Sequence, residues 1–241
     1  SWDAEKVIIM FDHLIPTCLP LDGDHMKRGY QFAEEFGARK VHAGDGICHQ
    51  LMPELGYARP GDVVFVTDSH TTTYGAVSAF STGIGYTEMA AILGTGEMWV
   101  RVPSAIKIQI DGTLPDGVCS KDIALRVLGD LKAAGGTYKS LEFCGSTIDA
   151  MPVDERLTIA NMAVECGAKV GLFAPTKESC AYSNVNYDDV SWLHFDDDAE
   201  YEKVLTYKAE DMVPYIAAHP YVDNVKPLSE LEGMKVAKVF I

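Results

Sequence analysis

Short runs of β-branched and aromatic residues alternate with longer amphipathic stretches in the first part of the chain. The apolar runs predict strands at 7–11, 40–42 and 63–66. The amphipathic stretches predict helices at 24–36, 47–55 and 88–93, the first of them closed by Gly37 as its C-cap. Because strands alternate with helices, we expect a mostly parallel sheet covered on both faces.

The same alternation continues beyond Pro103, which we interpret as a domain boundary. Apolar runs predict strands at 105–110, 140–143 and 169–173. Ser120 is expected to cap a helix that runs to about 133, and Pro152 to open a helix that runs to Cys166. Residues 176–203 are acidic and polar, and we expect them to be a solvated surface. A last strand is predicted at 236–241, where the chain stops in mid-strand as a truncated protein would.

The length and composition fit a globular protein with more than one domain. The chain has 241 residues, of which 47% are hydrophobic and 23% charged, and this is enough to build a core without disulfides or metals. We predict one α/β domain at 1–102 and a second at 103–218. Residues 219–241 are expected to begin a third, truncated domain.

Charge and cysteine usage exclude several classes of function. The net charge of −15 argues against nucleic acid and anionic membrane as partners, since both require basic surfaces. The six cysteines are widely and irregularly spaced, without a C-x-x-C pair, which predicts reduced thiols in a cytoplasmic protein and no metal site. No apolar run reaches membrane-spanning length, and the N-terminal residues lack the features of a signal peptide.

Acids and imidazoles recur together after the predicted strands of the first domain. In open α/β sheets the carboxyl ends of the strands are where ligands bind. A carboxylate that accepts from one ring nitrogen fixes the tautomer of a histidine and stabilises its imidazolium, as proton transfer to a leaving hydroxide would require. The candidate residues are Asp12-His13 after 7–11, Asp45 and His49 after 40–42, and Asp68-Ser69-His70 after 63–66.

Two further polar stretches belong to this prediction. Thr67 to Thr73 is a row of hydroxyl, acid and imidazole side chains for which the sequence suggests no role in packing; the plain alternative is a polar turn that caps a helix. On the helix after Pro152, Thr158, Asn161 and Glu165 fall on one side at 100° per residue, although an ordinary amphipathic helix also has such a polar side.

Five collinear motifs give the chain a resemblance to a known family. It resembles the aconitase superfamily, and within it the large subunits of 3-isopropylmalate dehydratase and homoaconitase. The motifs are Phe-Asp-His-Leu-Ile-Pro-Thr (11–17), Gly-Asp-Gly-Ile-Cys-His-Gln (44–50), Thr-Asp-Ser-His-Thr-Thr-Thr-Tyr-Gly-Ala (67–76), Gly-Ile-Gly-Tyr-Thr-Glu-Met-Ala (83–90) and Thr-Ile-Ala-Asn-Met-Ala-Val-Glu-Cys-Gly-Ala (158–168).

The resemblance implies three-layer α/β/α domains with mostly parallel sheets and a hydro-lyase that acts on a 2-hydroxy di- or tricarboxylic acid. It implies a [4Fe–4S] cluster in the full-length protein, in which one iron without a protein ligand binds the substrate. Carried over to this sequence, Asp12 and His13 protonate the departing hydroxyl, and Ser69 and Asn161 hold the substrate or the iron-bound solvent. Two further pairs are implied, Asp68 with His49 and Glu165 with His70.

The sequence also departs from the family pattern. The cluster cysteines of the family lie in a Gly-Ser-Cys-Thr-Asn segment and a later C-x-x-C, and none of the six cysteines here matches them. We therefore expect no cluster in this segment, which alone should be inactive. Thr72 stands where many isopropylmalate enzymes have Cys, which weakens assignment to that subgroup. The resemblance also implies a small subunit that carries a swivelling domain.

Several alternatives stay open at this point. The substrate of the full-length protein could be 3-isopropylmalate, homocitrate or 2,3-dimethylmalate. The chain could instead be a binding module, like the aconitase relatives that bind RNA, although it lacks a basic stripe. A folded fragment or degenerate paralogue without chemistry is the third alternative.

Overall fold

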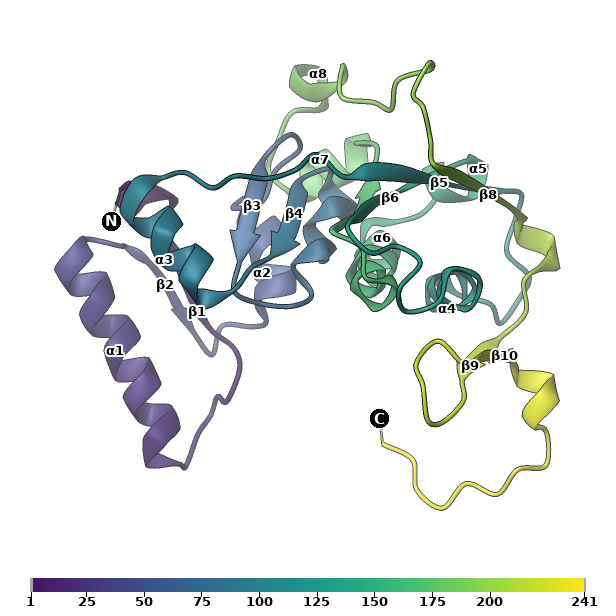
Figure 1. Ribbon diagram of the computed structural model, residues 1–241, viewed down its shortest axis with the longest axis horizontal. Coiled ribbons are helices and arrows are strands. Elements are labelled where there is room, and N and C mark those ends of the chain that lie inside the picture. Colours follow the sequence, from purple (N-terminus) through teal and green to yellow (C-terminus); the bar gives the residue numbers. More distant parts are fainter. Residues whose placement is uncertain (1, 241) are drawn as a thin grey trace.

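The computed structural model describes residues 2–240 and begins with two small parallel sheets. β1 (Ile8–Phe11) pairs with β2 (Lys40–Ala43), and α1 (Pro20–Phe36) forms the crossover between them (Figure 1). β3 (Val63–Val66) pairs with β4 (Phe80–Gly83) through the 3₁₀ helix η2 (Thr71–Val77). The other elements of this part are η1 (Ala4–Lys6), α2 (Cys48–Glu54) and α3 (Tyr86–Thr95).

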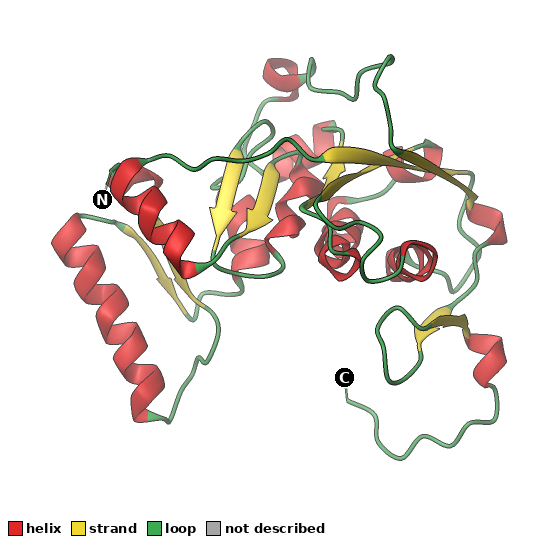
Figure 2. Cartoon of the chain, viewed as in Figure 1, coloured by secondary structure: helices red, strands yellow, loops and turns green. Residues whose placement is uncertain are grey.

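A four-stranded parallel sheet organises the second part of the chain. Its strand order is β7-β6-β5-β8, with β5 (Ser104–Asp111), β6 (Lys139–Cys144), β7 (Val170–Phe173) and β8 (Lys203–Lys208). An antiparallel hairpin of β9 (Tyr215–Ala217) and β10 (Val225–Pro227) follows it (Figure 2). The helices are α4 (Ser120–Leu131), α5 (Ser146–Asp149), α6 (Val153–Met162), η3 (Ala163–Cys166), α7 (Lys177–Tyr182), α8 (Tyr187–Val190), η4 (Ala209–Asp211) and η5 (Leu228–Leu231).

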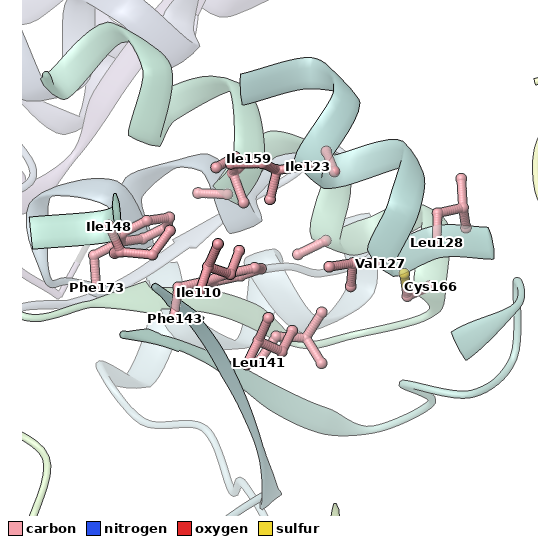
Figure 3. Packing of buried hydrophobic residues seen from close by; sticks show 14 of the residues in the cluster. Ile110, Ile123, Val127, Leu128, Leu141, Phe143, Ile148, Ile159, Cys166 and Phe173 are labelled. Atoms are coloured by element: carbon pink, nitrogen blue, oxygen red, sulfur yellow. The ribbon is translucent and has the colours of Figure 1, made fainter. Parts of the chain in front are cut away.

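The larger core lies between this sheet and helices α4 and α6. Alternate residues of β5, Ile106, Ile108 and Ile110, are fully buried, as the two-residue period of a strand requires. Figure 3 shows Ile110 on the side of the sheet that faces Ile123 of α4 and Ile159 of α6. The rings of Phe143 and Phe173 are stacked, with their centroids 5.0 Å apart. Each such buried side chain contributes roughly 1.5–3 kcal/mol. The mixed α/β class with mostly parallel sheets is confirmed, and the helices of this core cover one face of the sheet.

A second, smaller core holds the first part of the chain against the second. It contains Tyr74 and Val77 of η2 together with Val153, the first residue of α6. Gly75 allows a close approach here, because a Cβ at that position would collide with the backbone oxygen of Gly171 on β7. The predicted domain limits at 102 and 218 stay predictions; the hairpin β9–β10 pairs residues on either side of the second limit.

Several predicted elements differ from the observed ones at their ends. α1 begins at Pro20 rather than at residue 24, because proline is well suited to the first turn of a helix; Gly37 closes it with a φ of 75°. The N-cap of α4 is Cys119, whose backbone N–H donates to the Asp122 carboxylate, so the prediction of Ser120 was wrong. The helix predicted to reach Cys166 changes to 3₁₀ geometry after Met162.

Two predictions about the later chain were wrong. Residues 236–240 form no strand and are exposed, since no neighbouring strand pairs with them; residue 241 lies outside the described residues. The acidic stretch 176–203 is only partly a solvated surface, because Ser179, Cys180 and Ser183 are fully buried. Between residues 2 and 240, no helix has both the length and the apolar character needed to cross a membrane.

Candidate active site

The first carboxylate–histidine pair lies directly after β1. Asp12 Oδ1 is 2.8 Å from His13 Nδ1, and Asp12 Oδ2 accepts a 2.7 Å hydrogen bond from the backbone N–H of Cys48 at the start of α2. Burial acts to raise the pKa of Asp12, but the bonds from Cys48 and His13 outweigh it and hold the pKa below its ordinary value. The hydrogen bond to Asp12 raises the pKa of His13 above 6.5. His13 is therefore favoured as an imidazolium, and its side chain is 72% exposed.

Asp68, at the turn after β3, lies between two histidines. Its Oδ2 is 3.3 Å from His13 Nε2, and its Oδ1 is 2.9 Å from His49 Nε2. The same Oδ1 accepts the backbone N–H of His70 at 2.7 Å, which fixes the carboxylate to its own turn. A single carboxylate therefore joins a histidine from the end of β1 to a histidine from the first turn of α2.

His49 has the opposite electrostatic environment to His13. Its side chain is only 17% exposed, and burial lowers its pKa below 6.5 although Asp68 acts in the other direction. The Nδ1 atom of this ring is buried and has no hydrogen-bond partner among the described residues. His49 is thus favoured as a neutral imidazole that donates through Nε2 to Asp68.

The third pair links the two parts of the chain. His70 Nε2 is 3.4 Å from Glu165 Oε1 on η3, and its Nδ1 is 2.9 Å from the hydroxyl of Ser69. The ring centroids of His70 and His49 are 6.2 Å apart, so the pairs form one cluster. Asn161 approaches from α6 and donates to Thr73 Oγ1 at 2.9 Å. The predicted site residues, which come from strand ends, α6 and η3, are thereby brought together.

The threonines after His70 do have a packing role, so the prediction that they have none was wrong. Thr71, Thr72 and Thr73 are buried, and each hydroxyl donates to a backbone carbonyl, of Asp68, Asn161 and His70 respectively. Short hydroxyl side chains can satisfy such buried carbonyls within a tight helix. These bonds build η2 as the support of the site.

Asp45 does not belong to the cluster suggested by its position in the sequence. Its Oδ2 lies 2.8 Å from Nδ1 of His42, whose Nε2 is 3.2 Å from the hydroxyl of Tyr57. The carboxylate that contacts His49 is therefore Asp68 rather than Asp45, although Asp45 is closer in the sequence. Sequence reasoning also missed the contact of His13 with Asp68, since it joins two strand ends that are not paired as neighbours in one sheet.

An open groove of about 350 Å³ adjoins the cluster. His49, Thr73 and Asn161 line the end that belongs to the site. The rest combines apolar and polar side chains: Ile47, Gln50, Lys121, Asp154, Leu157, Thr158, Met162 and Tyr182. Of the carboxylate–histidine pairs, His49 is the member that lines this groove.

Three carboxylate–histidine pairs thus lie together in a parallel α/β protein, an arrangement whose chemistry suits proton transfer. Comparison with known protein families identifies the family of the chain. The chain belongs to the aconitase family: the family model described as aconitase family (aconitate hydratase) matches residues 17–239.

Curated relatives are similar over the whole chain. It is 40% identical to the 3-isopropylmalate dehydratase large subunit 1 of Methanopyrus kandleri, over 100% of this chain and 58% of that protein. It is 42% identical to the 3-isopropylmalate dehydratase large subunit 2 of Archaeoglobus fulgidus, over 99% and 58%. A probable methanogen homoaconitase large subunit of Methanosarcina mazei is 39% identical, over 100% and 62%. The chain therefore spans less than two thirds of the length of these relatives.

Proposed function

We propose that this chain supplies the acid–histidine part of a hydro-lyase that dehydrates and rehydrates a 2-hydroxy diacid, of the 3-isopropylmalate dehydratase type. The observation that carries the proposal is the shared carboxylate of Asp68, which lies within 3.3 Å of both His13 and His49. Similarity to large subunits of 3-isopropylmalate dehydratase supports the substrate class.

In this proposal His13 protonates the departing hydroxyl. Asp12 holds Nδ1, so Nε2–H is the proton available for transfer, and its 3.3 Å contact with Asp68 is long enough to be shared with a substrate oxygen. The hydrogen bond to Asp12 raises the pKa of His13, which favours the protonated ring. Loss of hydroxide needs such an acid, because hydroxide is a poor leaving group.

The other residues orient and bind. His49 donates to Asp68 and stays neutral, which leaves the negative charge of Asp68 to stabilise His13 as an imidazolium. Glu165 and Ser69 hold the two nitrogens of His70, which lies at the exposed side of the cluster. Ser69 and Asn161 present polar atoms toward the bound substrate or solvent in this proposal.

The family also implies a [4Fe–4S] cluster, which supplies a Lewis acid when bound. Among residues 2–240, no three His, Cys, Asp or Glu side chains are placed to hold a metal. Burial raises the pKa of Cys48 and Cys166 to about 12, whereas cluster ligands are thiolates. Cys48 and Cys166 therefore do not fit as cluster ligands, and we propose that the ligands lie in the remainder of the whole protein. No step is derived through it.

We further propose that the whole protein works with a small subunit and in the cytoplasm. The relatives are named as large subunits, which supports the proposal of a small subunit. Homocitrate-type substrates form a second candidate, since a homoaconitase large subunit is 39% identical over the whole chain. 2,3-Dimethylmalate stays within the same class of 2-hydroxy diacids.

The test is an assay of the full-length protein, purified with its small subunit without exposure to air. Dehydration of 3-isopropylmalate, homocitrate and 2,3-dimethylmalate is followed by the absorbance of the unsaturated acid. We expect 3-isopropylmalate to give the highest kcat/KM and His13→Gln to lower kcat by at least about 10²-fold. Absence of turnover with all three hydroxy acids in a cluster-loaded preparation contradicts the proposed function.

A further inference from the structure

Two neighbouring rings at the candidate site each carry a buried polar atom that has no hydrogen-bond partner among the described residues. One is Nδ1 of His49 and the other is the hydroxyl of Tyr74 on η2. Their rings are 6.0 Å apart between centroids, with 44° between the ring planes. Buried polar atoms without partners are rare in folded proteins and call for a physical explanation.

The two atoms have complementary hydrogen-bonding capacity. An ionised Asp68 can only accept, so its 2.9 Å contact with His49 places the proton on Nε2 and leaves a lone pair on Nδ1. Tyr74 is fully buried, and this burial raises its pKa, so it remains a phenol with an O–H to donate. An unpartnered acceptor and an unpartnered donor therefore lie on two neighbouring rings.

The backbone holds Tyr74 firmly in this place. Its neighbour Gly75 packs against Gly171 of β7 so closely that no Cβ fits, and Thr73 is bonded to Asn161. The ring belongs to the smaller core, together with Met52 of α2. A residue held from both sides in this way can restrict the orientation of a neighbouring imidazole.

We propose that Tyr74 is a positioning residue for His49: its hydroxyl donates to Nδ1 through one buried water, and so fixes the tautomer that donates to Asp68. This inference rests on the proposed function only for its effect on rate. It assigns a role to the tyrosine of the 67–76 motif, which the proton-transfer pairs themselves do not use.

Other ionisable groups lie close to His49 and Tyr74 and would contribute to the pH dependence of the rate. His49 faces Asp68, Asp12 and His70, and the hydroxyl of Tyr74 faces the thiol of Cys48 as well as the same two aspartates. None of these is altered by the substitution Tyr74→Phe, which removes one oxygen atom and keeps the ring. That substitution therefore isolates the hydroxyl.

The experiment compares full-length wild-type protein with Tyr74→Phe and with Ser81→Ala. Ser81 is a fitting control, because its hydroxyl on β4 is equally buried and unpartnered but lies outside the carboxylate–histidine pairs. The ¹⁵N resonances of His49 are followed by NMR in histidine-labelled protein. In parallel, kcat, KM and the pH profile of kcat are measured with 3-isopropylmalate.

In Tyr74→Phe we expect the Nδ1 resonance of His49 to move toward that of an imine nitrogen without a hydrogen bond. We expect kcat to fall about tenfold with KM little changed and the pH profile displaced, whereas Ser81→Ala alters none of these. An unchanged Nδ1 resonance overturns the proposal whatever happens to the rate. A displaced resonance with unchanged kcat and pH profile overturns the positioning role. The NMR result does not depend on turnover. Failure of the proposed function can therefore be distinguished from failure of the positioning role.

Discussion

His13 and His49 share one carboxylate but lie in opposite environments. Both contact Asp68, yet the side chain of His13 is 72% exposed and that of His49 is 17% exposed. The pKa of His13 is raised by its bond to Asp12, whereas burial lowers the pKa of His49. The comparison shows that burial and a second carboxylate, rather than the shared partner, decide which ring carries the proton.

Removal of the shared partner should have the largest effect. In Asp68→Asn, both histidines lose their common carboxylate, and we expect kcat of the full-length protein to fall by about 10³-fold or more. The matched control is Asp188→Asn, an exposed acid in the first turn of α8. A loss of less than about tenfold in kcat shows that the shared carboxylate is not needed.

The difference in burial predicts different costs in stability. His49→Gln removes the 2.9 Å contact of a largely buried ring with Asp68, and we expect a loss of roughly 1–3 kcal/mol in the free energy of unfolding. His13→Gln changes an exposed side chain and should alter stability by no more than about 0.5 kcal/mol. Urea unfolding of the two variants measures both values. Equal losses would remove the distinction between the two rings.

The opposite pKa shifts of His13 and His49 predict opposite effects of pH on stability. The pKa of His49 is depressed by folding, so its contribution is present above pH 6.5 and is lost as the pH falls toward the folded pKa. The pKa of His13 is raised, so its contribution is present below pH 6.5 and is lost as the pH rises through the folded pKa. His49→Gln should therefore flatten the fall in stability below pH 6.5. His13→Gln should leave that fall in place.

Asp12 separates the two histidines further, since of these two rings it is hydrogen-bonded only to His13. Asp12→Asn removes the main cause of the raised pKa of His13, so the alkaline limb of the kcat profile should move to lower pH. The pH–rate profile of the full-length variant measures the displacement. The control is Asp45→Asn, whose carboxylate contacts His42 and not the site. If the alkaline limb stays at its wild-type pH, it reports the titration of a group other than His13.

The smallest effect is expected at the support of the site. Asn161→Ala removes the 2.9 Å hydrogen bond to Thr73 and should cost roughly 0.5–1.5 kcal/mol of stability. Thr158→Ala, on the same helix, loses only a bond to the helix backbone and should cost less. Thermal unfolding of the two variants compares them. A larger loss for Thr158→Ala argues that η2 does not depend on Asn161.

Much of this fold follows from local patterns. The strand at 63–66 has the bounds that its β-branched run predicts, and Gly37 closes α1 because a left-handed residue is needed there. Residues 236–240 also belong to an apolar run, but they pair with no strand among the described residues. Pairing with a neighbouring strand, which a local pattern does not contain, decides between these two cases.

The candidate site was predictable in its residues but not in its electrostatics. Acids and histidines after strands indicate proton transfer, and the family motifs imply the pairs of His49 and His70. The contact of His13 with Asp68 depends on how two separate sheets are placed, and the burial of His49 depends on packing against Tyr74. Both are tertiary effects, so a sequence gives the chemical groups without their protonation states.

A single NMR titration tests the account most directly. Histidine-labelled full-length protein is titrated from pH 5 to 9, and the resonances of the two rings are assigned with His13→Gln and His49→Gln. The account predicts that His13 titrates above pH 6.5 and His49 below it. Equal pKa values, or the reverse order, would contradict the claim that one carboxylate holds one histidine charged and the other neutral.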